Sequence, residues 1–210
     1  SDVYKRQGVD WKTAAASAAK VLNHIGGVDG MDPTGWTWYC NVDDIEKLSP
    51  TESPAEILWR GERAKSLSLE EDNFPPTLYG NGRINPTQNL VDAFPMLNGY
   101  PVSHLSGEYD ENLPYANRDP RLEAYILYNG CKAGNTNKEI FTAADGTTND
   151  ALNKVVGRST RTGYYLRKLL RQDISLDPNA KADQYHYTPR IRYTEIFLAY
   201  AEAVSYTHLR

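Results

Sequence analysis

The chain has 210 residues, with 23 Lys and Arg against 27 Asp and Glu, which gives a formal net charge of -4 at pH 7. A chain of this length fits one domain and can bury roughly 70% of its unfolded surface. Because basic and acidic residues are mixed along the sequence, no basic patch is available to attract nucleic acid. No apolar run reaches about 18 residues, the length of a membrane-spanning helix.

The first helix is predicted over Trp11–Ile25. Asp10 can accept a hydrogen bond at its N-terminus, and apolar residues recur at helical spacing until Gly26-Gly27 ends the pattern. The many alanines on one face allow a second helix to approach closely, as the helix pairs of stacked repeats require.

Loops and short elements are predicted for the next stretch. Glu56-Ile57-Leu58 is either extended or a single turn, and residues 60–83 are rich in Gly, Pro and Asn, which is typical of loop. Thr87 is a candidate N-cap for a short helix over residues 88–94.

The middle of the chain is where a small sheet is predicted. Arg121–Tyr128 is rich in Leu, Tyr and Ile and is followed by Asn129-Gly130, which favours a turn. Tyr164–Leu166 is the candidate partner strand. Between them, Cys131–Thr160 is polar and is predicted to form a long variable loop.

The last helix is predicted over Pro189–Ala203. Thr188 can cap it, Pro189 lies in the first turn where a missing N–H costs nothing, and apolar residues recur at helical spacing after it. We expect its apolar face to be incompletely covered.

No metal, cofactor or catalytic site is predicted. Cys40 and Cys131 have no C-x-x-C pattern or His pair beside them, so a zinc site lacks ligands. An oxidising compartment would allow a disulfide between them, but two free buried thiols are the favoured interpretation. The acidic runs Glu70-Glu71-Asp72 and Asp43-Asp44 are typical of solvated faces, whereas a glycosidase needs two carboxylates about 5–10 Å apart with one in an apolar setting.

Four stretches in a fixed order carry the most specific signal. They are Pro86–Phe94 with Asn98-Gly99, Asn117–Leu122, Thr162–Lys168 and Arg190–Ala203. In this order and spacing they resemble the SusD/RagB family, the outer-membrane lipoproteins of Bacteroidota that capture glycans or peptides above a TonB-dependent transporter. The resemblance covers residues 8–203.

This resemblance implies a mainly α, SusD-like fold, related to tetratricopeptide helical stacks, with long loops and at most a small β-hairpin. It makes residues 8–203 a partial SusD/RagB-like domain, and the ends 1–7 and 204–210 look like translated adapter sequence outside the native chain. The implied location is the cell-surface face of the outer membrane, where a lipid anchor that is not part of this segment holds the full-length protein.

The implied function is capture of an oligosaccharide and its delivery to a SusC-like TonB-dependent transporter, without catalysis. In the family, binding residues frequently lie between the Glu-Ile and Pro-Thr-Gln segments. Here that region carries two aromatic rings to stack on sugar faces and three polar side chains to orient hydroxyls: Trp59, Arg60, Tyr79, Asn81 and Arg83. The 15 Tyr and 4 Trp against 4 Phe suit such half-wet surfaces.

Several alternatives stay open at this point. Trp59 follows Ile57-Leu58 directly and could pack in the core. Trp36 and Trp38 would point to the same side of an extended segment, as a second stacking platform or as a packed edge. The function could also be peptide capture, as in the RagB branch, or binding of protein partners by a tetratricopeptide-like scaffold with a continuous helical groove.

Overall fold

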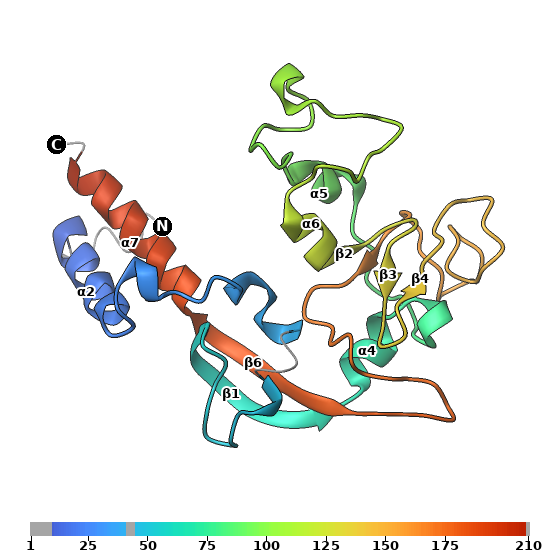
Figure 1. Cartoon of the computed structure of the whole chain (residues 1–210), viewed down its shortest axis with the longest axis horizontal. Helices are drawn as coiled ribbons and strands as arrows, with labels where there is room; N and C mark the ends of the chain where they lie inside the picture. Colours follow the sequence, from blue (N-terminus) through green and yellow to red (C-terminus); the bar gives the residue numbers. More distant parts are fainter. Residues whose placement is uncertain (1–9, 41–44, 209–210) are drawn as a thin grey trace. The chain divides into compact units, whose positions relative to one another are not determined.

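The computed structural model describes residues 10–40 and 45–208, which fall into two compact units. Unit 1 is formed by Ser1–Arg63 and Tyr187–Arg210, and unit 2 by Ala64–His186. Figure 1 shows the elements of both units coloured along the sequence. Helices account for 32% and strands for 16% of the structure, so the expectation of a mainly helical fold is confirmed only in part.

Two helices pack side by side in unit 1. α2 (Trp11–Asn23) lies along α7 (Tyr193–His208) (Figure 1), and the rings of Trp11 and Tyr206 stack with centroids 4.6 Å apart. As predicted, Asp10 caps α2, because its carboxylate accepts a first-turn backbone N–H at 2.7 Å. Two short 3-10 turns follow, η1 (Val28–Gly30) and η2 (Gly35–Cys40).

The predicted start of the last helix at Pro189 is wrong. This proline lies in β6 (Gln184–Arg192), which pairs with β1 (Ile57–Ser66) in a two-stranded sheet where the missing N–H is tolerated at an edge. α7 begins after the strand because the buried carboxylate of Glu56 accepts hydrogen bonds from the backbone N–H and hydroxyl of Thr194, at 3.3 and 2.6 Å. The cap therefore comes from a residue distant in sequence.

The β1/β6 sheet also corrects the expectation of at most a small β-hairpin. β1 has 10 residues and β6 has 9, and both run through charged stretches without the alternation typical of a half-buried strand. The region 60–83, predicted as mostly loop, holds most of β1, then α4 (Ser68–Asn73) and the 3-10 turn η3 (Pro76–Leu78).

In unit 2, the predicted pairing of two distant segments is confirmed. β2 (Ile126–Leu127) is antiparallel to β5 (Tyr165–Leu166), with Leu127 opposite Tyr165. The strand is shorter than predicted, because α6 (Pro120–Tyr125) takes up most of the segment that precedes it.

The segment 131–160 is more than a loop. β3 (Lys132–Ala133) and β4 (Lys138–Glu139) form a hairpin within it. Its residues also enter the main core cluster of unit 2, which consists of Phe74, Leu78, Leu127, Cys131, Ala133, Ile140, Tyr165, Leu170, Ile174 and Leu176. Cys131 is a free, buried cysteine, and burial raises the pKa of its thiol to about 11; the side chain of Cys40 lies outside the described residues.

Three of the four sequence stretches meet in a second core cluster of unit 2, which consists of Val91, Leu122, Ile126 and Tyr164. The first stretch forms α5 (Gln88–Ala93), capped by Thr87 as predicted, and a 3-10 turn, η4 (Leu105–Gly107), follows it. The hydroxyl of Tyr164 donates to the side chain of Gln88 at 2.8 Å. These stretches therefore hold the fold together.

Candidate functional site

Three of the five predicted binding residues lie on one loop of unit 2, residues 79–83. Consecutive backbone N–H groups of this loop donate to carbonyl groups of α4 and the residues after it. The bonds run from Asn81 to Glu71 at 2.9 Å, from Gly82 to Phe74 at 3.0 Å and from Arg83 to Asp72 at 2.9 Å. These bonds within the protein fix the loop backbone, which lowers the ordering cost of binding.

Two glycines determine which side chains of the loop face outward. Gly80 and Gly82 are buried, and a Cβ atom would lie 2.1 Å from a backbone oxygen at Gly80 and 2.2 Å from another at Gly82. The positions between and beside them, Tyr79, Asn81 and Arg83, are exposed or half-buried. These three side chains therefore share the outer face of the loop.

The outer face combines one aromatic ring with polar groups. Tyr79 is 46% exposed, and the ammonium group of Lys138 lies 5.5 Å from its ring centroid. The Nε atom of Arg83 is 3.2 Å from a carboxylate oxygen of Asp72. Asn81 is half-buried, and its side-chain amide can both donate and accept hydrogen bonds.

A buried carboxylate anchors the turn before this loop. Asp150 is fully buried, and its side chain accepts the backbone N–H of Thr77 at 2.8 Å. Its backbone oxygen accepts the hydroxyl of Tyr165 at 2.9 Å, while Arg158 donates to the carbonyl of Gly80 at 3.0 Å. Burial raises the pKa of Asp150. The segment that was predicted to be a variable loop thus supports the candidate site.

Comparison with known proteins assigns the family. A family model described as the SusD family matches residues 58–208. The chain belongs to the SusD family. The match includes all four stretches noted in the sequence and also residues 204–208, which continue α7. The domain limits at 8 and 203 stay predictions, and residues 1–7 lie outside the described part of the chain.

Two solved structures share the fold of this SusD-family chain. A SusD-like carbohydrate binding protein from Bacteroides fragilis is 22% identical with a TM-score of 0.64, over 92% of this chain and 36% of the other. A second SusD-like protein from the same organism is 24% identical with a TM-score of 0.64, over 94% and 40%. The chain thus spans less than half the length of either structure. No match was found among the curated proteins.

The other two predicted binding residues, Trp59 and Arg60, lie on β1 in unit 1 of this SusD-family chain. Trp59 is 62% exposed, so the alternative of a core position is wrong. The guanidinium group of Arg60 donates to the carbonyl groups of Pro50 and Glu52 and to the hydroxyl of Ser53, at 2.8 to 3.0 Å. These bonds tie Arg60 to the segment before the strand.

The second candidate platform, Trp36 and Trp38, is a packed edge. Trp38 is only 4% exposed, and its ring meets that of Tyr39 edge to face, with centroids 5.8 Å apart. Trp36 is half-buried in the same 3-10 turn. Because the segment is a turn and not a strand, residues two apart do not share a face.

The acidic run at 70–72 was predicted to be solvated, and this is wrong for Glu70. Its side chain is fully buried, accepts the backbone N–H of Arg171 at 2.9 Å and lies 3.0 Å from Nε2 of His186. These contacts hold α4 in place. Asp43 and Asp44 lie outside the described residues, and the described ones include no group of three or more His, Cys, Asp or Glu that could hold a metal ion.

Sequence reasoning missed Lys138, Asp150 and Arg158 around the candidate loop. They come from a segment far along the chain, in a polar stretch without a motif. No local signal could have paired them with Tyr79.

No helix within residues 10–40 and 45–208 has the length and apolar character needed to cross a membrane.

Proposed function

We propose that the protein captures oligosaccharides at the cell surface, lipid-anchored to the outer membrane in its full-length form, and delivers them to a SusC-like TonB-dependent transporter. Membership of the SusD family supports this proposal, as does the fold shared with a SusD-like carbohydrate binding protein. The proposed activity is binding alone, with no bond made or broken.

The observation that carries the proposal is the outer face of the 79–83 loop. Half-exposed Tyr79 lies there on a backbone held by hydrogen bonds, and the same loop carries the amide of Asn81 and the guanidinium group of Arg83. Aromatic rings stack on the apolar faces of sugar rings, and amide and guanidinium groups bind hydroxyls. This combination suits a neutral polar ligand presented from solvent.

The five residues take different roles in the proposal. Tyr79 provides the stacking surface in unit 2, and Trp59 provides an exposed ring in unit 1. Asn81 and Arg83 orient sugar hydroxyls and so discriminate between sugars. Arg60 supports the strand that carries Trp59, since its donors are used within the protein.

The test is calorimetric titration of the protein with a panel of oligosaccharides. Tyr79→Ala is expected to weaken binding by roughly 1–3 kcal/mol, taking stacking of a base on an aromatic ring as the analogue. Trp59→Ala, which removes an exposed ring of unit 1, is expected to weaken binding by a similar amount. Asn81→Ala and Arg83→Ala should change the order of preference among the sugars.

Tyr100→Ala is the matched control, because Tyr100 is 45% exposed in the same unit but stacks on His104. It should leave the affinity unchanged. Unchanged affinity in both Tyr79→Ala and Trp59→Ala, with native circular dichroism, would remove the site assignment. Binding of unfolded peptides in place of any sugar would favour peptide capture instead.

Delivery is tested separately from capture. The gene neighbourhood should include a SusC-like transporter and a set of glycoside hydrolases, whose specificities would identify the glycan. The protein and that transporter should then copurify when they are expressed together in an outer membrane. Sugar binding without copurification would leave capture in place and contradict delivery.

A further inference from the structure

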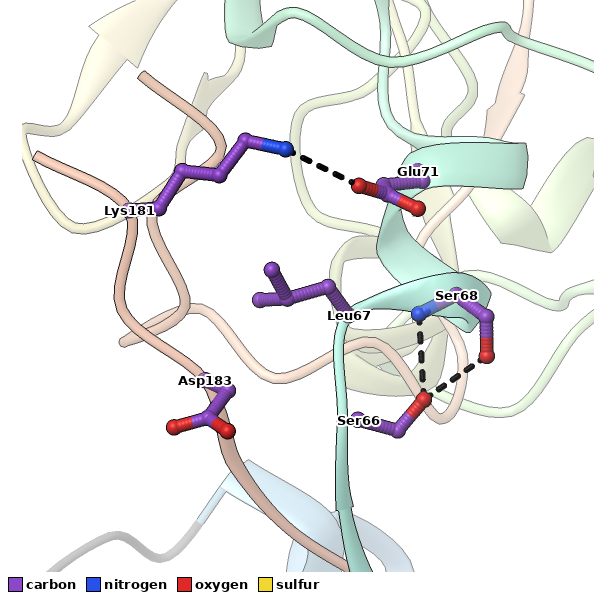
Figure 2. Close-up of a pocket in the computed structure, with 6 residues that line it drawn as sticks. All are labelled: Ser66, Leu67, Ser68, Glu71, Lys181 and Asp183. Carbon is purple, nitrogen blue, oxygen red and sulfur yellow. Dashed lines mark hydrogen bonds and ion pairs between the residues drawn. The ribbon is translucent and has the colours of Figure 1, made fainter. Parts of the chain in front are cut away.

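Unit 2 has a pocket that belongs to none of the predicted sites. It has a volume of about 430 Å³ and lies between the start of α4 and the chain just before β6, within the roughly 300–1,000 Å³ of known small-molecule sites. Figure 2 shows Leu67 pointing into the space between the two walls. The lining residues are Ser66, Leu67, Ser68, Glu71, Lys181 and Asp183.

Both walls of the pocket are held by contacts within unit 2. On one side, the hydroxyl groups of Ser66 and Ser68 are 2.7 Å apart, and Leu67 packs against the main core cluster. On the other side, Ser175 and Ala182 form a β-bridge with backbone hydrogen bonds of 3.2 and 3.0 Å. The pocket is therefore a formed feature of the fold.

The charges at the pocket cancel in pairs. Lys181 lies 3.3 Å from Glu71, as Figure 2 shows, and Asp183 lies 3.4 Å from Lys65. All four side chains are about half exposed, and ion pairs of this kind contribute only about 0–1 kcal/mol. A ligand can therefore replace these contacts with its own at little cost.

This arrangement favours a neutral ligand that carries several hydroxyl groups. A hydroxyl can donate to Glu71 or Asp183 and accept from Lys181 at the same time. An acidic ligand would instead compete with two carboxylates for the same ammonium groups, and a basic ligand would compete with two ammonium groups for the same carboxylates. Leu67 offers an apolar surface to the C–H face of a ring.

We propose that this pocket binds a neutral sugar residue, as a second contact for the oligosaccharide held at the 79–83 loop. The inference rests on the proposed function. Both places are built on α4: the side chain of Glu71 lines the pocket while its carbonyl group holds Asn81, and the next residue, Asp72, pairs with Arg83. The pocket selects neutral over acidic glycans.

The first experiment locates the sugar on the protein. The whole protein is treated with an amine-reactive reagent, with and without neutral gluco-, manno- or xylo-oligosaccharides, and the modification of each lysine is measured by mass spectrometry. A neutral oligosaccharide that binds in calorimetry should slow the modification of Lys181 and leave exposed Lys154 unchanged. Oligogalacturonate of matched length should protect neither.

The second experiment measures affinity. Lys181→Gln and Asp183→Asn should each weaken binding of the neutral oligosaccharide by roughly 3- to 10-fold, because a neutral hydrogen bond to the ligand is weaker than the charged one that it replaces. The matched controls are Lys154→Gln and Glu123→Gln, which remove the same charges at exposed positions outside the pocket and should change nothing.

The outcomes separate this inference from the proposed function. Sugar binding that weakens in Tyr79→Ala, with unprotected Lys181 and unchanged affinity in both pocket variants, would overturn the pocket and leave the function standing. No binding of any sugar would overturn both. Protection of Lys181 by oligogalacturonate as strong as that by neutral sugars would overturn the selectivity.

Discussion

Arg118 and Asp119 are neighbours in the sequence, but they stabilise different parts of unit 2. The buried guanidinium group of Arg118 donates to the carbonyl groups of Val91 and Phe94, at 2.7 and 2.8 Å. These groups lie at the end of α5, where the last carbonyl groups of a helix have no N–H partner within the helix. Asp119 caps α6 by accepting the backbone N–H of Arg121, and it also pairs with that residue's guanidinium group at 2.6 Å. Arg118 thus satisfies carbonyl groups at the end of α5, and Asp119 satisfies a backbone N–H at the start of α6.

We predict that Asp119→Ala lowers the free energy of unfolding by roughly 0.5–2 kcal/mol, the usual cost of a lost N-cap. The hydrogen bond from Arg121 lowers the pKa of Asp119 in the folded protein. Its stabilising contribution is therefore complete above the unfolded pKa, which is about 3.9, and is lost as the pH falls through the lower folded pKa.

Denaturant titrations at neutral pH and at successively lower pH would check this prediction. The difference between the original chain and Asp119→Ala should shrink as the pH falls. Asp119→Asn, which keeps an acceptor oxygen but loses the charge, should have a smaller effect. Sugar affinity of the folded fraction should not change, and an affinity loss at full stability would place this residue in the binding site.

At the scale of elements, the short helix α4 organises the surface of unit 2. Its carbonyl groups hold the 79–83 loop, its side chains reach the pocket and pair with Arg83, and buried Glu70 fixes it to Arg171 and His186. A helix this short is marginal by itself in water. Its position therefore depends on these contacts.

We predict that Gly82→Ala disrupts the 79–83 loop. Gly82 has a φ of +54°, and a Cβ atom there would lie 2.2 Å from a backbone oxygen and 2.6 Å from the ring of Tyr165. Gly157→Ala is the matched control, because Gly157 also has positive φ but has no atom within 4 Å of the added carbon. The loss of stability at Gly82 should exceed that at Gly157 by roughly 1–3 kcal/mol, the cost of overpacking.

Thermal or denaturant unfolding of both variants would measure this difference, and titration with sugar would show its consequence. Gly82→Ala should bind sugar more weakly even where it is fully folded, because Tyr79 and Asn81 lose their fixed backbone. Equal stability of the two variants would show that the loop backbone can shift to accommodate the added carbon, and it would contradict the idea of a preorganised site.

At the scale of the whole molecule, both units leave large apolar side chains in solvent. On α7, Leu198 is 60% exposed while Phe197 and Tyr200 are half-buried, so the expected exposure of this helix is confirmed most clearly at Leu198. In unit 2, Leu105 is 97% exposed. Exposed apolar surface favours association with other apolar surfaces.

We predict that the 210-residue chain binds a hydrophobic dye or self-associates, and that Leu198→Gln reduces both effects without loss of helix content. Dye fluorescence, light scattering and circular dichroism would measure them. Leu105→Gln, which removes an exposed leucine of unit 2, shows how much of the dye signal comes from that side chain. A monodisperse monomer with a sharp cooperative melt and no dye signal would contradict this prediction.

Local features of the sequence were enough to predict several elements. Asp10 and the spacing of apolar residues predicted α2, and Thr87 predicted the start of α5. These predictions hold because a helix cap and a helix face involve residues within a few positions of one another. The 79–83 loop was predicted as a candidate site only through the family resemblance, and its role in binding stays a prediction.

Other features depended on contacts between distant residues. α7 starts where it does because Glu56 caps it, and β1 and β6 are strands because each supplies the other's hydrogen bonds. The anchor of the candidate loop at Asp150 and the pairing of Glu71 with Lys181 are of the same kind. A strand, a cap or a pocket wall formed by a remote partner leaves no periodic pattern in its own segment, so only the tertiary structure could decide them.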